Sequence, residues 1–342
     1  MVKSKITCRL YKLKKVTSLD DVKKNILIRR YSDPLKVSLR DKKIAGTLSE
    51  EEKNFYFTWG DVSEQNEIRL EESIVDKQEE SVAYFFATAN IEYTKRKKKD
   101  SNGNFLPKAE RVNNAPIMTY FFCMNNSFHL IICSSNDIHV GRVKKLVGKD
   151  YIDKLDEGYE MPPDLFNWLF FKYTQNEGIL DSRINLMNIS GFIGNTGDEH
   201  NIFRGTSDQT SELIITKAFI SNGETLRTIT ARLRNEDIDI VFTIDDMSNT
   251  QIFVNQSTKL KLLEAENNNI FIIIYLYSYL IPKLKSLYNN ASKQFLDKEK
   301  KQFSEKIGLE VIESIINHNS LSFKEVSALF KRPSILMKIE NK

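Results

Sequence analysis

Cysteine is scarce in this chain of 342 residues, which contains only Cys8, Cys123 and Cys133. The three lack the short spacing of a zinc site, and an odd number of cysteines cannot all form disulfides. The first residues, Met1-Val2-Lys3-Ser4-Lys5, do not lead into the apolar segment of a signal peptide. We therefore expect a protein of the reducing cytoplasm, where disulfide frameworks are rare.

Long apolar runs are also missing. The longest, residues 270–281, has Ser278 inside it and Pro282 after it. A helix that crosses a membrane needs about 20 predominantly apolar residues. This run therefore predicts a helix buried in the protein core and no membrane span.

Neither sign of charge prevails. The 50 Lys and Arg residues face 46 Asp and Glu residues, and the net charge is +4. Such a balance does not by itself identify a nucleic-acid partner, although the pI near 8.7 leans in that direction. The local distribution of charge is therefore more informative than the sum.

The residues that are abundant are those of a folded protein, with 41% hydrophobic and 11% aromatic side chains. Alternating or continuous apolar runs predict strands near residues 5–15, 54–59, 81–93, 117–124, 128–133, 184–193, 199–206, 227–234, 237–244 and 250–254. Helical patterns begin at residues 18, 139, 164 and about 210, and the chain is helical in pattern after residue 257. The predicted fold class is α+β, with antiparallel sheets, packed helices and a helical C-terminal tail.

Three regions follow from this pattern. Residues 1–160 form an α+β region with a basic loop at 95–104, and residues 161–258 form a β-meander with an aromatic helix. Residues 259–342 form a helical region. The first boundary is placed at Pro162-Pro163, because consecutive prolines interrupt regular structure.

Residues suited to catalysis or metal binding are not grouped. The four histidines, His129, His139, His200 and His318, have no partner at ligand spacing, and His129 is expected to be a core histidine. The glycine-rich residues 191–197 lack the Lys-Ser/Thr ending of a phosphate-binding loop and are typical of a turn. We expect no catalytic residue, no metal and no cofactor.

Clustered carboxylates leave one enzymatic alternative, a metal-dependent nuclease that uses Asp198, Glu199, Asp237 and Asp239. Against it, Asp237 and Asp239 alternate with isoleucines, which predicts the solvent face of a strand. Asp198 and Glu199 follow a turn, and Asp245-Asp246 also fit a turn.

Two basic clusters remain as candidates for function. They are residues 95–99, in a turn-rich segment, and the helix after residue 139: Lys95, Arg96, Lys97, Lys98, Lys99, Arg142, Lys144, Lys145 and Lys149. Lysine and arginine runs neutralise phosphates and release counterions, which gives salt-sensitive binding without sequence preference. A solvated loop and an ordinary helix surface are the alternatives for the two clusters.

Several segments occur in an order that resembles the RdgC family of bacterial recombination-associated DNA-binding proteins. They are the opening strand at residues 6–11, the strand and Ser-Ser turn at 130–135 before a basic helix, and the aromatic helix at 164–172. The longest runs from Ile202-Phe203-Arg204-Gly205 through Asn222-Gly223-Glu224 to residue 244. The similar patches lie within residues 5–255, whereas residues 95–114 and 259–342 have no counterpart in the family.

The resemblance implies a ring-like homodimer that encloses duplex DNA, rather than single-stranded DNA, without sequence preference. It also implies a role in recombination control or, by analogy, in phage defence. The sequence thus predicts a non-catalytic DNA-binding protein without sequence preference. A further alternative is an interaction subunit of a multi-component defence complex that docks a protein partner through residues 259–342.

Overall fold

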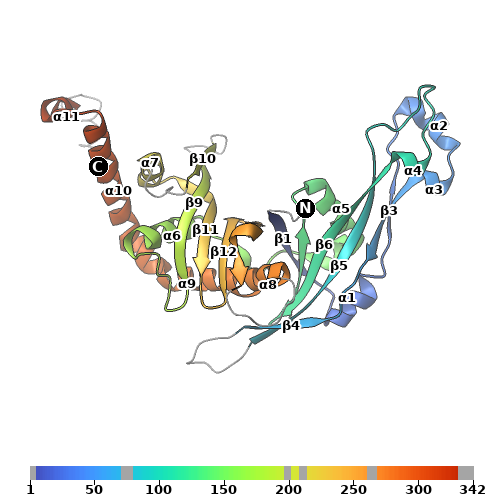
Figure 1. Cartoon of the computed structure of the whole chain (residues 1–342), viewed down its shortest axis with the longest axis horizontal. Coiled ribbons are helices and arrows are strands. Elements are labelled where there is room, and N and C mark those ends of the chain that lie inside the picture. The colour runs from blue at the N-terminus through green and yellow to red at the C-terminus, as the bar shows by residue number, and fades with distance from the viewer. Residues whose placement is uncertain (1–4, 71–79, 196–201, 208–213, 260–267, 330–342) are drawn as a thin grey trace. The chain divides into compact units, whose positions relative to one another are not determined.

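The computed structural model describes residues 5–70, 80–195, 202–207, 214–259 and 268–329 (Figure 1). The chain forms two compact units: unit 1 contains residues 1–161 and 234–286, and unit 2 contains residues 162–233 and 287–342. The chain leaves unit 1 beside Pro162-Pro163, but residues 234–286 return to it. The units therefore do not coincide with the three expected regions.

Unit 1 is built on one antiparallel sheet with the strand order β12-β13-β1-β7-β6-β5-β3-β2. Its strands are β1 (Ile6–Leu13), β2 (Tyr31–Pro34), β3 (Asn54–Gly60), β5 (Glu80–Thr94), β6 (Val112–Met124), β7 (Ser127–Cys133), β12 (Ile238–Asp245) and β13 (Thr250–Ile252). Three short strands extend it: β4 (Asn66–Leu70) pairs with β5, β8 (Ile152–Asp153) with β1, and β14 (Thr258–Lys259) with β12. The segment after residue 233 therefore completes the sheet that the N-terminal segment begins.

Two helices cover one face of this sheet, α1 (Leu19–Asn25) and α5 (Asp137–Val147). Each begins at a capped residue: Ser18 accepts a hydrogen bond from Asp21 N–H, and Asn136 accepts from the N–H groups of Ile138 and His139. Their apolar stripes pack against inward-facing side chains of β1, β3, β5, β6 and β7 to form the core.

Helix α8 (Asn268–Tyr275) and the π-helical turn Leu276–Leu280 pack on unit 1 through Tyr277. The Tyr277 hydroxyl lies 2.9 Å from Thr250 Oγ1. It also lies at donor distance, 3.1 Å, from each of the carbonyl oxygens of Cys8 and Ser248. The side chain is fully buried. This network ties the apolar helix to β1 and to the start of β13.

Short helices gather at one end of β3 and β5: α2 (Lys42–Gly46), α3 (Glu50–Lys53) and α4 (Lys108–Arg111), with a 3₁₀ turn at Leu39–Asp41 (Figure 1). Strand β3 pairs with β5 only from Phe57 onward. Before Phe57 the two strands are bridged by side chains and by the helices α3 and α4. This bridged region is the base of the site described below.

Unit 2 contains the strands β10-β9-β11 in that order: β9 (Asn185–Asn195), β10 (Ile202–Thr206) and β11 (Thr225–Arg234). Its helices are α6 (Pro163–Gln175), α7 (Ile214–Ser221), the second half of α9 (Ile281–Gln294), α10 (Lys300–His318) and α11 (Phe323–Leu329), with a π-helical turn at Phe295–Glu299 between α9 and α10. Helix α6 packs on the C-terminal helices through Trp168 against Tyr288 and Phe171 against Phe295 and Phe303. An ion pair of 2.6 Å between Lys300 Nζ and Asp164 Oδ1 adds to that contact.

The expected α+β class is confirmed, and so is the hairpin expected at residues 117–133. Strands β6 and β7 are joined at Asn125 and Asn126, whose φ angles are +49° and +57°. Asparagine tolerates this left-handed conformation, which a tight hairpin turn requires at both central residues.

One expectation about the acidic residues is wrong. Asp239 is only 7% exposed, so it does not lie on a solvent face of its strand. Its neighbours Ile238, Ile240 and Phe242 are buried as well. Period-2 alternation marks a solvent face only where one side of a sheet is open, and β12 is covered on both sides.

The apolar run at 270–281 is buried, as expected, with Ile272, Ile274 and Ile281 fully inaccessible. Within the described ranges, the helical stretch Asn269–His318 is nevertheless long and apolar enough to cross a membrane by length and composition. However, 61% of its most apolar 18-residue segment is buried inside the protein. The stretch is therefore only weak evidence for a membrane span, since the core helix of a soluble protein has the same length and composition.

Candidate nucleic-acid interface

The first predicted basic cluster lies in a small hairpin that follows β5. Lys99 and Phe105 face each other across it, and Leu106 N–H donates to the Lys98 carbonyl oxygen. At its turn, Asp100 Oδ1 accepts from the N–H groups of Asn102 and Asn104 at 2.9 and 2.8 Å. Of the exposed loop or hairpin tip expected at residues 95–104, the hairpin is thus confirmed.

The five cations of this cluster are not equivalent. Lys95 Nζ donates to the Glu110 carbonyl oxygen at 3.0 Å, and Lys99 Nζ pairs with Asp41 Oδ1 at 2.5 Å. Arg96 and Lys97 are exposed and Lys98 is half-buried. These three side chains make no hydrogen bond or ion pair to any described residue, so no described partner neutralises their charge.

The Lys99–Asp41 ion pair brings a second basic segment to the hairpin. Asp41 lies between Arg40 and Lys42-Lys43 at the start of α2, and these three cations are exposed. They, too, make no hydrogen bond or ion pair within the described residues. We call the surface formed by Arg40, Lys42, Lys43, Arg96, Lys97 and Lys98 the basic tip.

Sequence reasoning missed the contribution of Arg40, Lys42 and Lys43. The signal was present as the run Arg40-Asp41-Lys42-Lys43, a charged segment between two predicted elements. Its proximity to residues 95–99 depends on a contact between residues 58 positions apart, which no local pattern reveals.

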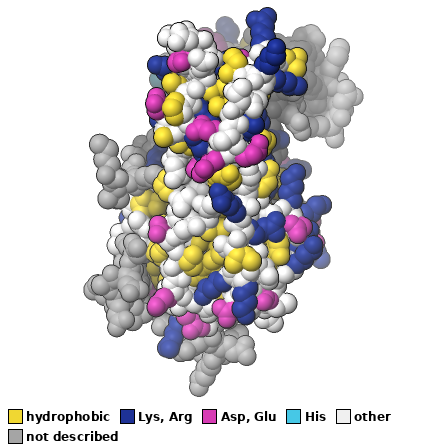
Figure 2. All heavy atoms as spheres, turned by 90° about the vertical axis from the view of Figure 1, so that its right-hand side faces the viewer, with side chains coloured by type: hydrophobic (Ala, Val, Ile, Leu, Met, Phe, Trp, Pro, Cys, Tyr) yellow, Lys and Arg dark blue, Asp and Glu magenta, His cyan; other side chains and the backbone are white. Residues whose placement is uncertain are grey.

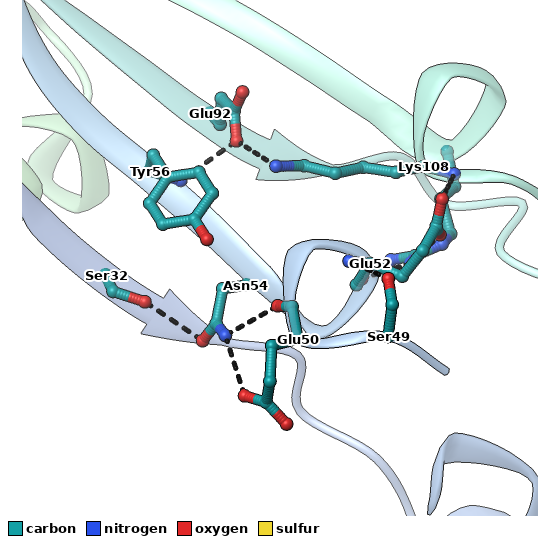
Figure 3. Close-up of polar contacts among 9 residues, drawn as sticks. Ser32, Ser49, Glu50, Glu52, Asn54, Tyr56, Glu92 and Lys108 are labelled. Carbon is teal, nitrogen blue, oxygen red and sulfur yellow. Dashed lines mark hydrogen bonds and ion pairs between the residues drawn. The ribbon is translucent and has the colours of Figure 1, made fainter. Parts of the chain in front are cut away.

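The carboxylates at the base of the tip are neutralised from within (Figure 3). Glu92 on β5 accepts from Tyr56 N–H at 2.9 Å and pairs with Lys108 Nζ at 2.8 Å. Glu52 on α3 accepts from Lys108 N–H at 3.1 Å and pairs with Arg111 Nη2 at 2.8 Å. Their charges therefore do little to offset the cations of the tip.

The pKa values follow the same contacts. Burial alone would raise the pKa of Glu52, but the hydrogen bond from Lys108 N–H and the Arg111 guanidinium lower it overall. The hydrogen bond from Lys99 is the main reason that the pKa of Asp41 is lowered. Both carboxylates stay ionised and paired at neutral pH.

Figure 3 also shows how α3 is fixed next to β2 and β3. Asn54 Nδ2 donates to the Glu50 carbonyl oxygen at 2.8 Å, and Ser32 Oγ donates to Asn54 Oδ1 at 2.9 Å. Ser49 caps the helix by accepting from Glu52 N–H. The base of the tip is thus a hydrogen-bonded support and not a loose loop.

The second predicted cluster lies on α5, except for Lys149 in the 3₁₀ turn that follows, and the three cations on the helix have partners inside the protein. Arg142 lies 5.1 Å from the Tyr93 ring, Lys144 4.6 Å from the Tyr11 ring and Lys145 5.4 Å from the Tyr31 ring. Cation–π contacts of this kind stabilise the packing of a helix on a sheet. Lys145 also pairs with Asp33 at 3.4 Å, whereas Lys149 is exposed.

Burial lowers the pKa of Arg142, and burial and the neighbouring Arg142 lower that of His139. Since Tyr93 lies two residues before Lys95 and contacts Arg142, the structure brings both predicted clusters to the same end of β5. The helix cluster, however, offers less free charge than the hairpin.

Figure 2 shows one face of unit 1, on which Lys and Arg side chains lie along one edge and toward both ends, the end that carries the short helices included. Asp and Glu side chains are interspersed among them. The basic tip is therefore a local feature, in keeping with the small net charge of +4.

The candidate nuclease carboxylates fall into two groups. Asp198 and Glu199, with His200, lie outside the described residues. Asp237 accepts a hydrogen bond from the Tyr275 hydroxyl at 3.0 Å, and Asp239 is buried. In the portion of the chain that the structure describes, no three His, Cys, Asp or Glu side chains are placed to hold a metal ion.

Comparison with known proteins gives no match, either to a family model or to a curated protein. The resemblance to the RdgC family therefore stays a prediction that rests on the sequence segments described above.

Proposed function

We propose that unit 1 binds nucleic acid, duplex DNA in the first place, through the basic tip and without sequence preference or catalysis. One observation carries the proposal: the carboxylates at the base of the tip are paired internally, while Arg40, Lys42, Lys43, Arg96, Lys97 and Lys98 are left unpaired among the described residues. Such an arrangement suits phosphate groups, which attract cations irrespective of base sequence.

The aromatic rings described next to the tip already carry cations of the protein itself. Phe105 already lies 5.1 Å from Lys99 Nζ, and Tyr56 carries Arg30 and Lys108 over its ring at 3.8 and 4.5 Å. Binding of single strands usually adds stacking of bases on aromatic rings. Occupied rings therefore favour backbone contacts to a duplex.

The test is a binding titration with fluorescent duplex DNA, single-stranded DNA and RNA over a range of salt concentrations. The triple substitution R96A/K97A/K98A should weaken duplex binding and reduce the slope of log K against log salt by roughly 2 to 3, since each lost phosphate contact removes about 0.9. The matched control is K293A/K298A/K301A, which removes the same charge from exposed positions on the C-terminal helices.

An unchanged slope in the R96A/K97A/K98A protein would place the contact elsewhere, and no binding at low salt would overturn the proposal. Preference for single strands or RNA would revise the partner. Incubation of the same probes with Mg²⁺ or Mn²⁺ separates the alternatives, because a metal-dependent nuclease would degrade them.

A second candidate, a protein–protein contact through α10, is favoured by a specific surface. Leu309 and Ile312 are 68% and 51% exposed on the side of the helix away from the buried Phe303 and Ile307. Contiguous exposed apolar patches mark interaction sites when they are large, and Ile315, 43% exposed, extends this surface along the helix. We propose that the occupant is a second copy of the chain, in line with the homodimer expected from the sequence.

A further inference from the structure

Two of the three cysteines meet inside unit 1. Cys8 on β1 and Cys133 on β7 are direct cross-strand partners in the antiparallel register, and their Sγ atoms are 3.6 Å apart. Directly opposed residues of an antiparallel pair have Cα atoms about 4.5 to 5.5 Å apart. This spacing falls within the range that a disulfide accepts, about 4.4 to 6.8 Å.

The two thiols differ in access. Cys8 is fully buried, whereas Cys133 is half-buried. Cys133 lines a pocket of about 560 Å³ together with Thr7, Met118, Tyr120, Ser134 and Ile273. A molecule the size of a peroxide can therefore reach Cys133 from the pocket, whereas Cys8 is fully buried and does not line it.

We propose that Cys133 and Cys8 are a peroxide-responsive thiol pair in which Cys133 is oxidised first and Cys8 then closes a disulfide. This inference is independent of DNA binding, because both cysteines lie in the sheet and away from the basic tip. The hydrogen bond with Cys133, together with burial, raises the pKa of the Cys8 thiol, which keeps it protonated until its partner has reacted.

The chemistry balances with hydrogen peroxide as the oxidant. The Cys133 thiol gives up its proton, the thiolate attacks one peroxide oxygen and the O–O bond breaks. Cys133 becomes a sulfenic acid, and the hydroxide that leaves takes up the released proton to form water. Cys8 sulfur then attacks Cys133 sulfur, the S–O bond breaks, and the Cys8 proton leaves with that oxygen as water. The sum is two thiols and one peroxide giving one disulfide and two water molecules.

The disulfide would link the N-terminal strand to the β6–β7 hairpin. Strand β1 pairs with β7 on one side and with β13 on the other, so it joins residues 1–161 to residues 234–286. A covalent link at Cys8 therefore holds this joining strand in place. The two cysteines are 125 positions apart, so the link closes a long loop of the unfolded chain.

Cys123 supplies the matched control within the same sheet. It is half-buried like Cys133, but its cross-strand neighbours are Ala83 and Phe128. No second thiol faces it, so it can be oxidised but cannot close an intramolecular disulfide.

The experiment treats the full-length reduced protein with hydrogen peroxide, alkylates the remaining thiols and maps the peptides by mass spectrometry without reduction. We expect a Cys8–Cys133 peptide pair within single chains that are not cross-linked to each other, a mass lower by two hydrogen atoms, and Cys123 alkylated. C123S should behave like the unsubstituted protein, and C8S should leave Cys133 as a sulfenic acid that a dimedone reagent traps.

A cross-link between chains, or oxidation confined to Cys123, would overturn the proposal. So would failure to form the Cys8–Cys133 pair at peroxide concentrations that oxidise Cys123. A melting temperature that rises by several degrees on oxidation and returns on reduction supports the stapling of β1, and a lower one contradicts it. Because the peptide map uses the unsubstituted protein, its result does not depend on whether a cysteine variant folds.

Discussion

His129 is a core histidine, as its apolar strand predicted, but neither ring nitrogen has a hydrogen-bond partner among the described residues. Its ring is buried, stacked on Phe122 at 4.8 Å and in edge contact with Tyr159 at 5.3 Å. Nε2 lies 3.5 Å from Asp156 Oδ2, which is too long for a strong hydrogen bond. Burial lowers the pKa of His129 to about 4, and the Asp156 charge offsets only part of this shift.

This pKa predicts a loss of stability in mild acid. In the unfolded chain the imidazole takes up a proton near pH 6.5, whereas in the folded protein it does so only near pH 4. The folded pKa of this base is depressed, so its stabilising effect is complete above pH 6.5 and is lost as pH falls toward 4. The free energy of unfolding should fall by up to about 3 kcal/mol over that window.

The measurement is denaturant unfolding from pH 7.5 to 4.5 for the unsubstituted protein and for H129F. Phenylalanine keeps the ring stack with Phe122 and has no proton to gain, so its curve should be flatter by the His129 contribution. Parallel curves would show that other groups carry the acid sensitivity.

At the scale of elements, the short helices of the tip depend on one buried cation. Arg111, at the end of α4, is fully inaccessible and bonds to Leu106 O through Nε at 2.8 Å, and to Glu52 through Nη2. It thereby joins α4 and the loop before it to α3. Its Nη1 has no hydrogen-bond partner, a cost that the paired Nη2 and Nε offset.

Replacing Arg111 by methionine should destabilise the protein by roughly 2 to 4 kcal/mol. The substitution leaves Glu52 without its cation and the Leu106 carbonyl oxygen without its hydrogen bond. Glu52 is a third exposed, which holds the effect below that of a fully buried pair. The double substitution R111M/E52Q should recover part of the loss. Urea unfolding of both proteins checks this, and additive effects would contradict a direct coupling.

Helix α5 illustrates how the same sequence signal can have a different structural meaning. Its cations looked like a phosphate-binding surface, but Arg142, Lys144 and Lys145 lie over tyrosine rings of the sheet. The tyrosines come from β5, β1 and β2, which are remote from the helix in sequence. The spacing of charged residues along one helix does not indicate which of those side chains will contact another element of the fold.

At the scale of the whole molecule, the proposed homodimer is tested by the exposed stripe on α10. The substitution L309E/I312E should convert a dimer into a monomer, because two carboxylates at the centre of an apolar contact cannot be desolvated cheaply. Light scattering after size-exclusion chromatography gives the mass directly. L296E, at another exposed apolar position of the C-terminal helices, is the control that should leave the mass unchanged.

A monomeric unsubstituted protein, or a dimer that survives L309E/I312E, would contradict this assignment. Both substituted side chains are more than half exposed, so folding of the monomer should be little affected.

Local pattern alone determined much of this protein. Alternation located the strands and the Asn125-Asn126 turn, capping residues located α1 and α5, and the turn-rich segment around Gly103 predicted the exposed basic hairpin. These features depend on interactions within a few residues, which the order of side chains along the chain specifies.

Only the tertiary structure decided which distant residues meet. It placed Arg40, Lys42 and Lys43 beside the basic hairpin, Cys8 opposite Cys133, and residues 234–286 in the same unit as the N-terminal sheet. It also buried Asp239 in a strand whose alternation predicted exposure. Strand register and the covering of a sheet's second face are set by long-range packing, so sequence periodicity, which reports on one element at a time, does not contain them.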